Sequence, residues 1–97
     1  MKYIIVFAVA AIFSSAAHAD IETDRTVGNC AGLLSALQKP QKVAEAIGYA
    51  DNQNRAIKFG MAWMDKVQGY GNDKTMVNSM VFSATSDCRS IGIRTTD

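Results

Sequence analysis

The sequence predicts an all-α fold, a small three-helix bundle stapled by one disulfide, with a four-helix bundle as the alternative. Three observations lead to this prediction. Residues 20–97 contain a single proline, Pro40, and no sustained alternation of apolar and polar residues, which would be typical of a strand. Apolar residues recur instead at intervals of three and four, as on one face of a helix. The chain also contains only two cysteines, Cys30 and Cys88.

Residues 1–19 have the three-part pattern of a secretory signal peptide. Lys2 precedes an apolar run over residues 3–13, and the small residues that follow end in Ala17-His18-Ala19. The apolar run is much shorter than the roughly 20 residues that a membrane-spanning helix needs. We therefore expect cleavage after this tripeptide, no stable membrane anchor, and a single helical domain over residues 20–97.

The expected location is the bacterial periplasm, or the medium outside the cell. The short cationic start and the Ala-x-Ala end of the signal are more typical of bacteria, and the chain has no Asn-x-Ser/Thr glycosylation acceptor. Cleavage removes Lys2 and the single histidine, His18, which leaves equal numbers of acidic and basic residues. We expect no binding to nucleic acid or to an anionic membrane, since both require clustered Lys and Arg.

Cys30 and Cys88 are expected to form a structural disulfide. An exported protein meets oxidising conditions, and a redox-active pair would more often be a close Cys-x-x-Cys. The bridge closes a loop of about 58 residues, which is worth roughly 4 kcal/mol in the chain-entropy description. A domain of this length obtains only a few kcal/mol from its core. The bridge is therefore expected to be essential for stability.

The first helix is expected to have an apolar face that begins at Val27 and to end at Pro40, while its start is left open. Its apolar residues follow the i, i+3, i+4, i+7 spacing of one buried face: Val27, Cys30, Ala31, Leu34 and Leu37. Asn29 is a candidate N-cap, because Gly28 weakens a helix at this point. A ridge of small residues, Gly28, Gly32 and Ala36, predicts close packing within the domain, with a homodimer seam as the alternative.

The second helix is expected over about residues 41–68. Its apolar stripe contains Val43, Ile47, Ala50, Ile57, Met61 and Met64. Gly48 and the polar run over residues 51–54 are helix-breaking signals, and in the four-helix alternative they divide this helix in two. The sequence Gly-Tyr-Gly-Asn over residues 69–72 predicts the turn that follows.

The third helix is expected to begin near Asp73, whose carboxylate suits a helix N-terminus. Its predicted inward face contains Val77, Met80, Val81, Ala84, Cys88 and Ile91. If the first two helices form a hairpin about Pro40, Cys30 and Cys88 both lie opposite the middle of the second helix. The predicted disulfide and the predicted three-helix arrangement are therefore consistent with each other. We expect residues 94–97 to be frayed.

No catalytic constellation is predicted, so the chain is expected not to be an enzyme and to need no cofactor. Without His18 the cleaved chain cannot assemble Ser-His-Asp or Cys-His catalysis, or a histidine-based metal site. The carboxylates, Asp24 among them, are expected to be spread along helical surfaces, which gives no support to a glycosidase-type pair.

Four methionines at helical spacing are weak candidates for Cu(I) ligands, although a helical core requires the same spacing: Met61, Met64, Met76 and Met80.

Three aromatic residues form a second stripe on the second predicted helix: Phe59, Trp63 and Tyr70. We favour the interpretation that they widen the core; the alternative is an exposed patch that binds a partner. The expected function is non-enzymatic protein–protein binding in the periplasm, as an accessory, inhibitor or exclusion factor of an envelope system. The expected partner is another envelope protein.

A signal peptide, a small helical domain and a long-range disulfide also resemble, in outline, the periplasmic acid-stress chaperones of the HdeA type. The resemblance implies a chaperone that exposes apolar faces when it partly unfolds. The spacing of Cys30, Cys88 and Trp63 differs from the pattern expected of that family, and no motif covers the chain. A stress chaperone is therefore the second hypothesis for function, after dedicated binding of one partner.

Overall fold

A computed structural model of the protein describes residues 21–96, so the predicted signal peptide lies outside the described residues. Every regular element in this range is an α-helix. The elements are an N-terminal helix over residues 21–36, α2 (Pro40–Ile47), α3 (Gln53–Tyr70) and α4 (Lys74–Ser90). The all-α prediction and its four-helix alternative are confirmed, whereas the continuous second helix is wrong. No helix in this range has both the length and the hydropathy required to cross a bilayer.

The N-terminal helix begins before the predicted apolar face and ends earlier than predicted. It is already helical at residue 21, so Asn29 lies inside it and is not an N-cap. It ends at residue 36, where Gln38 adopts a left-handed φ of 59°. The backbone N–H of Lys39 donates to the carbonyl of Leu34 at 3.0 Å, and that of Gln38 to the carbonyl of Ser35 at 3.0 Å. These two bonds are the pair that closes a helix in a Schellman motif.

Pro40 begins α2 rather than ending the preceding helix. It occupies the first turn, where its missing N–H has no intrahelical partner to lose. The chain then leaves the helical conformation after Gly48, and Asn52 starts α3 by accepting a hydrogen bond from the Arg55 N–H at 3.1 Å. The breaker residues noted in the sequence therefore separate α2 from α3.

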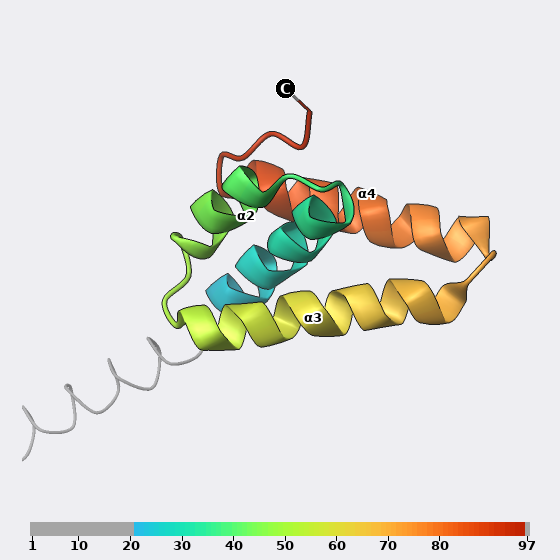
Figure 1. Ribbon diagram of the computed structural model, residues 1–97, viewed down its shortest axis with the longest axis horizontal. Coiled ribbons are helices and arrows are strands. Elements are labelled where there is room, and N and C mark those ends of the chain that lie inside the picture. Colours follow the sequence, from blue (N-terminus) through green and yellow to red (C-terminus); the bar gives the residue numbers. More distant parts are fainter. Residues whose placement is uncertain (1–20, 97) are drawn as a thin grey trace, which may run out of the picture.

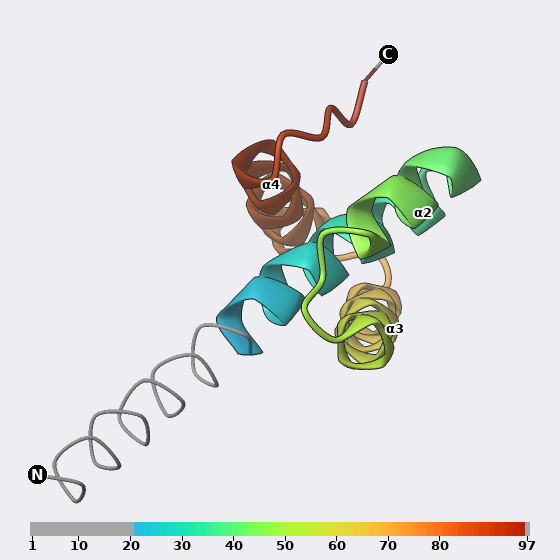
Figure 2. The ribbon, with the colours of Figure 1, turned by 90° about the vertical axis from the view of Figure 1, so that its left-hand side faces the viewer.

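The helices α3 and α4 form a hairpin, and the N-terminal helix crosses between them (Figures 1 and 2). The turn between α3 and α4 uses Gly71 with a positive φ of 56°. Asp73 caps α4 by accepting a hydrogen bond from the Met76 N–H at 3.2 Å. The predicted turn and the predicted start of the last helix are both confirmed.

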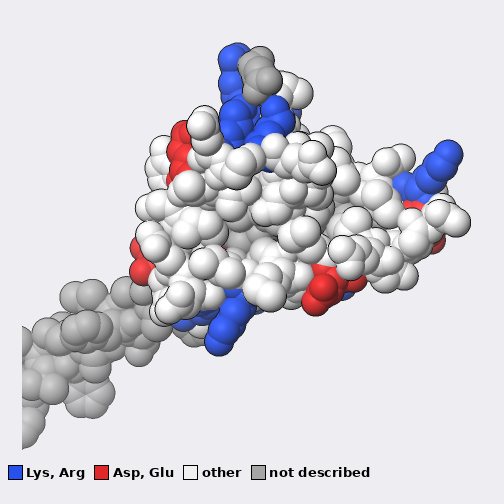
Figure 3. Space-filling view, viewed as in Figure 1, with Lys and Arg blue, Asp and Glu red and all other residues white. Residues whose placement is uncertain are grey.

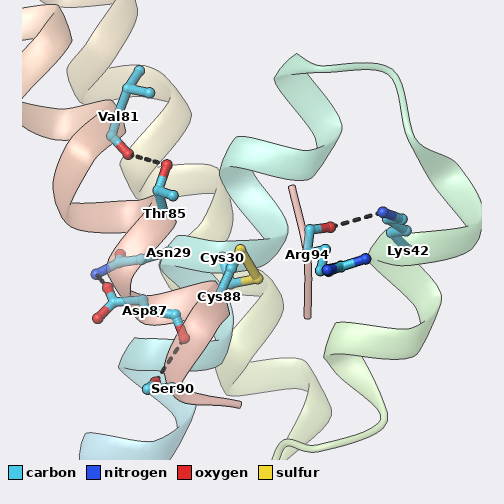
Figure 4. Close-up of a disulfide and its surroundings, with 9 residues drawn as sticks. All are labelled: Asn29, Cys30, Lys42, Val81, Thr85, Asp87, Cys88, Ser90 and Arg94. Carbon is cyan, nitrogen blue, oxygen red and sulfur yellow. Dashed lines mark hydrogen bonds between the residues drawn. A yellow bond between two sulfur atoms is a disulfide. The ribbon is translucent and has the colours of Figure 1, made fainter. Parts of the chain in front are cut away.

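The disulfide joins the N-terminal helix to α4, with the Cα atoms of Cys30 and Cys88 4.8 Å apart (Figure 4). Both cysteines are fully buried in a cluster with Ala31, Leu34, Ala46 and Ile93. The predicted pairing is confirmed, but the bridge packs against α2 through Ala46 and not against the middle of a long second helix. A second buried cluster forms around Leu33, Trp63 and Ala84.

Within α3 the predicted apolar stripe of the second helix is wrong at Ile57 and Met61, whereas Met64 packs against the cluster around Trp63. Ile57 and Met61 are 44% and 61% exposed, and the buried face is formed by Ala56, Gly60 and Trp63. The reason is the interruption after α2. The three- and four-residue spacing that starts at Val43 marks one helical face only while the helix continues, and the chain is not helical between α2 and α3. Leu37, also predicted to be buried, is 45% exposed because it lies beyond the end of the N-terminal helix.

The N-terminal helix and α3 cross at glycines. A Cβ atom on Gly28 would lie 2.6 Å from the Ala56 carbonyl oxygen, and one on Gly32 would lie 2.9 Å from the Gly60 carbonyl oxygen. The small-residue ridge therefore packs within the domain, as favoured, although Ala36 at its end is exposed.

The C-terminal segment after α4 is held to α2. The Lys42 ammonium donates to the carbonyl oxygen of Arg94 at 2.8 Å (Figure 4) and to that of Thr96 at 3.2 Å. Ile93 is buried in the cluster around the disulfide. The prediction of a frayed tail is wrong for this segment up to residue 96.

Candidate functional site

A groove of about 400 Å³ lies where the N-terminal helix, α3 and α4 meet. Its volume is within the range of ligand-binding pockets in proteins. Each helix contributes part of its wall: Arg25, Asn29, Phe59, Ala62, Trp63, Lys66, Met80 and Ser83. The groove exists because the N-terminal helix separates the two arms of the α3–α4 hairpin.

The floor of the groove is apolar and aromatic. Trp63 is 6% exposed and packs in the cluster with Leu33 and Ala84, while Phe59 and Met80 are half-buried. Trp63 follows Gly60 by three residues, so it continues the buried face of α3 into the groove. The absence of a side chain at Gly32 makes room for the indole ring, since a Cβ there would lie 2.9 Å from its Cε3 atom.

The rim of the groove is cationic. The guanidinium carbon of Arg25 lies 5.4 Å from the centre of the Phe59 ring, a cation–π geometry that places this cation at the mouth of the groove. Lys66 has no hydrogen-bond or ion-pair partner among residues 21–96. None of the residues that line the groove is a carboxylate. The apolar floor is therefore bordered by two positive charges without a lining counter-charge.

A hydrogen bond fixes the relative position of two walls. The Asn29 side-chain amide donates to the Asp87 carboxylate at 3.1 Å, which joins the N-terminal helix to α4 one residue from the disulfide (Figure 4). The amide oxygen of Asn29 and the hydroxyl of Ser83 remain as polar groups in the lining. The disulfide, this bond and the glycine crossing together hold the groove in one shape.

Asp24 forms a buried latch between the N-terminal helix and the loop before α3. Its carboxylate is fully buried and accepts hydrogen bonds from Arg55 Nε at 2.7 Å and from the backbone N–H groups of Asp51 and Asn52 at 2.9 and 3.2 Å. Burial by itself would raise the pKa of Asp24, but the bonds from Arg55 and the two backbone groups outweigh it. The pKa of Asp24 is thus lowered below its ordinary value of 3.8.

The latch corrects the expectation that all carboxylates lie on helical surfaces. A signal for it was present in the sequence, because Asp24 precedes Val27 by three residues and Ala31 by seven, on the same helical face. The predicted stripe began with the apolar residue Val27, which left Asp24 outside it.

The three aromatic candidates separate in the structure. Phe59 and Trp63 line the groove, and Tyr70 is half-buried at the C-terminal end of α3 outside the groove lining. They do not form one exposed patch, because Trp63 belongs to the core. Arg25, Lys66 and Met80 complete the groove, and neither cation was selected as a candidate from the sequence.

The four methionines divide between core and surface. Met64 and Met80 pack against the cluster around Trp63, whereas Met61 and Met76 are 61% and 38% exposed. Core packing accounts for the first pair. Among residues 21–96, no three or more His, Cys, Asp or Glu side chains come together as metal ligands would.

Comparison of the chain with protein-family models, with curated proteins and with solved structures found no match.

Proposed function

We propose that this protein is a small exported binding protein, without enzymatic activity, that holds another envelope protein in the groove between its N-terminal helix, α3 and α4. The observation that carries the proposal is the aromatic floor bordered by two cations. Aromatic residues and arginine are the side chains most enriched where protein interfaces gain their binding energy. Phe59, Trp63 and Arg25 bring this composition together in one concave surface.

The rigidity of the groove supports binding. The disulfide, the Asn29–Asp87 bond and the contacts at Gly28 and Gly32 connect the three walls, so little ordering is required when a partner binds. A surface that is ordered before binding loses less conformational entropy on association. The groove lining also contains no carboxylate, imidazole or thiol, so the Ser83 hydroxyl has no carboxylate or imidazole within the lining to act as a general base.

The test is a pull-down from native envelope extract with the tagged, disulfide-bonded chain, followed by mass spectrometry. Ala62 lines the groove and is exposed, so Ala62→Tyr fills the groove without disturbing the core. Met61, the neighbouring residue, is exposed and does not line the groove, so Met61→Tyr is the matched control. We expect one dominant partner that is lost with Ala62→Tyr and kept with Met61→Tyr. Loss with both variants, or with neither, would contradict the proposal.

The Asp24 latch supports a second candidate, an acid-stress chaperone. Protonation of Asp24 at low pH removes its attraction to Arg55 and the strong acceptor for two backbone N–H groups. The loop between α2 and α3 would then loosen and expose apolar surface to unfolding proteins. This hypothesis predicts many unrelated clients only after acid treatment, and client binding at neutral pH by Asp24→Asn. A single partner at neutral pH, unchanged by acid, would argue for dedicated binding instead.

A further inference from the structure

We infer that the groove accepts an acidic amphipathic helix of the partner protein, with an apolar side chain on Trp63 and carboxylates against Arg25 and Lys66. This inference rests on the proposed function, because it specifies the chemistry of the partner that the groove would bind. It is carried by the charge of the rim, the spacing of the two cations and the apolar floor between them.

The charge of the rim selects an anionic partner. The Arg25 guanidinium lies over the Phe59 ring, and neither Arg25 nor Lys66 has a hydrogen-bond or ion-pair partner among residues 21–96. No lining residue is a carboxylate; Asp87, which accepts the hydrogen bond from the lining residue Asn29, is not part of the lining. Charge-assisted hydrogen bonds between a partner carboxylate and these cations are about twice as strong as neutral ones. A basic partner would place like charges together beside a partly desolvated floor.

The spacing of the rim suggests a helix. Arg25 sits over Phe59, and Phe59 and Lys66 are seven residues apart on α3, so the α3 positions at which the two cations lie are about two helical turns, or roughly 10 Å, apart along the helix axis. A partner helix that presents Asp or Glu at positions i and i+7 matches this distance. Its residues at i+3 and i+4 lie between them on the same face and would contact Trp63 and Met80. A helix laid into an apolar groove is a recurrent mode of peptide recognition.

Other occupants fit the surface less well. Cytoplasmic anionic membranes are recognised by clusters of about four to eight Lys or Arg, and the groove offers two. On the one face drawn in Figure 3, positive and negative side chains both lie at the margins, so that face has no continuous basic surface. No single helix of a second copy of this chain supplies the pattern, because no two of its acidic residues are seven positions apart in the sequence.

The inference is tested by selection from a phage-displayed library of random 16-residue peptides on the exported chain, purified with its disulfide intact. We expect the selected peptides to carry Asp or Glu at i and i+7 with Leu, Phe or Met between them. We expect Arg25→Gln and Lys66→Gln each to weaken binding about three- to tenfold, Ala62→Tyr to abolish it and Met61→Tyr to leave it unchanged. Selection on Lys66→Glu should replace one acidic position by Lys or Arg. Circular dichroism of each variant confirms folding.

The outcomes separate the two proposals. Selected peptides that lack acidic residues but are lost with Ala62→Tyr would overturn the inferred chemistry and leave groove binding intact. Peptides insensitive to Ala62→Tyr, or no selected peptide at all, would also overturn the inference, whereas the proposed function is judged by the pull-down. Binding to phosphatidylglycerol vesicles that Ala62→Tyr abolishes would assign the groove to lipid. Self-association in sedimentation velocity that Ala62→Tyr abolishes would assign it to a second copy.

Discussion

Replacing glycine by alanine is expected to destabilise the protein at Gly28, where the N-terminal helix crosses α3, and to stabilise it at Gly69, where the added Cβ atom meets no neighbour. Gly28→Ala introduces a Cβ atom 2.6 Å from the Ala56 carbonyl oxygen and even closer to the Phe59 Cβ atom. Both obstacles are rigid, since one is backbone and the other is the first atom of a side chain. The helices must therefore move apart. At Gly69, also within α3, an added Cβ meets nothing within 4 Å.

The magnitudes follow from two opposing effects. Replacing glycine by alanine in a helix gains up to about 1 kcal/mol, because alanine loses less backbone freedom on folding. Overpacking typically costs about 1–3 kcal/mol, and two rigid neighbours place Gly28→Ala at the upper end of that range. We expect a net loss of about 2 kcal/mol for Gly28→Ala and a gain of about 0.5 kcal/mol for Gly69→Ala. For a domain of this size, 1 kcal/mol corresponds to about 4–8 °C in Tm.

The assay is urea unfolding of the disulfide-bonded chain followed by circular dichroism at 222 nm, with thermal unfolding as a second measurement. Gly69→Ala is the matched control because the chemical change is identical and only the surroundings differ. An equal rise in stability for both variants would refute the close crossing, and with it the packing that positions Trp63 in the groove.

Three further predictions concern the latch, the bridge and the end of the first helix. Because the pKa of folded Asp24 lies below its ordinary value of 3.8, its stabilisation is complete above the unfolded pKa and disappears as the pH falls through the folded value. The urea concentration at half-unfolding should therefore decrease as the pH is lowered below about 4 in the native chain, and it should decrease less steeply in Asp24→Asn. Cys30→Ala with Cys88→Ala should lower the free energy of unfolding by about 2–4 kcal/mol, and a change under 1 kcal/mol would show that the bridge is dispensable. Gln38→Gly should raise the Tm by a few degrees, since it removes about 1 kcal/mol of left-handed strain; an unchanged or lower Tm would contradict this reasoning.

Much of the fold was predictable because its signals are local. The spacing of Val27, Cys30 and Leu34 placed one buried face correctly, since side chains three, four and seven residues apart share a helical face wherever the helix lies. The disulfide followed from the number of cysteines and the expected compartment. The apolar face of α3 was not predictable by extending a stripe from α2, because the segment over residues 48–52 resets the helical phase.

The sequence indicated the aromatic residues of the candidate site but not its cations. Phe59 and Trp63 were selected for their aromatic character, which is a property of single residues. Arg25 and Lys66 were not selected, since nothing in the sequence shows that a cation of the N-terminal helix lies over a ring of α3. That contact depends on the distance between two helices, which Gly28 allows to be short.

The sequence by itself thus determined the helical class, the pairing of the two cysteines and the residues able to form an aromatic surface, and it contained the breaker residues that separate α2 from α3. Only the tertiary structure decided which of these residues line the same groove. In the folded protein Asp24 is buried against the loop before α3, Ile57 and Met61 are exposed, and two cations line the groove together with Trp63. The physical reason is that periodicity and composition act along one helix, whereas a groove and a buried charge exist only where separate helices pack together.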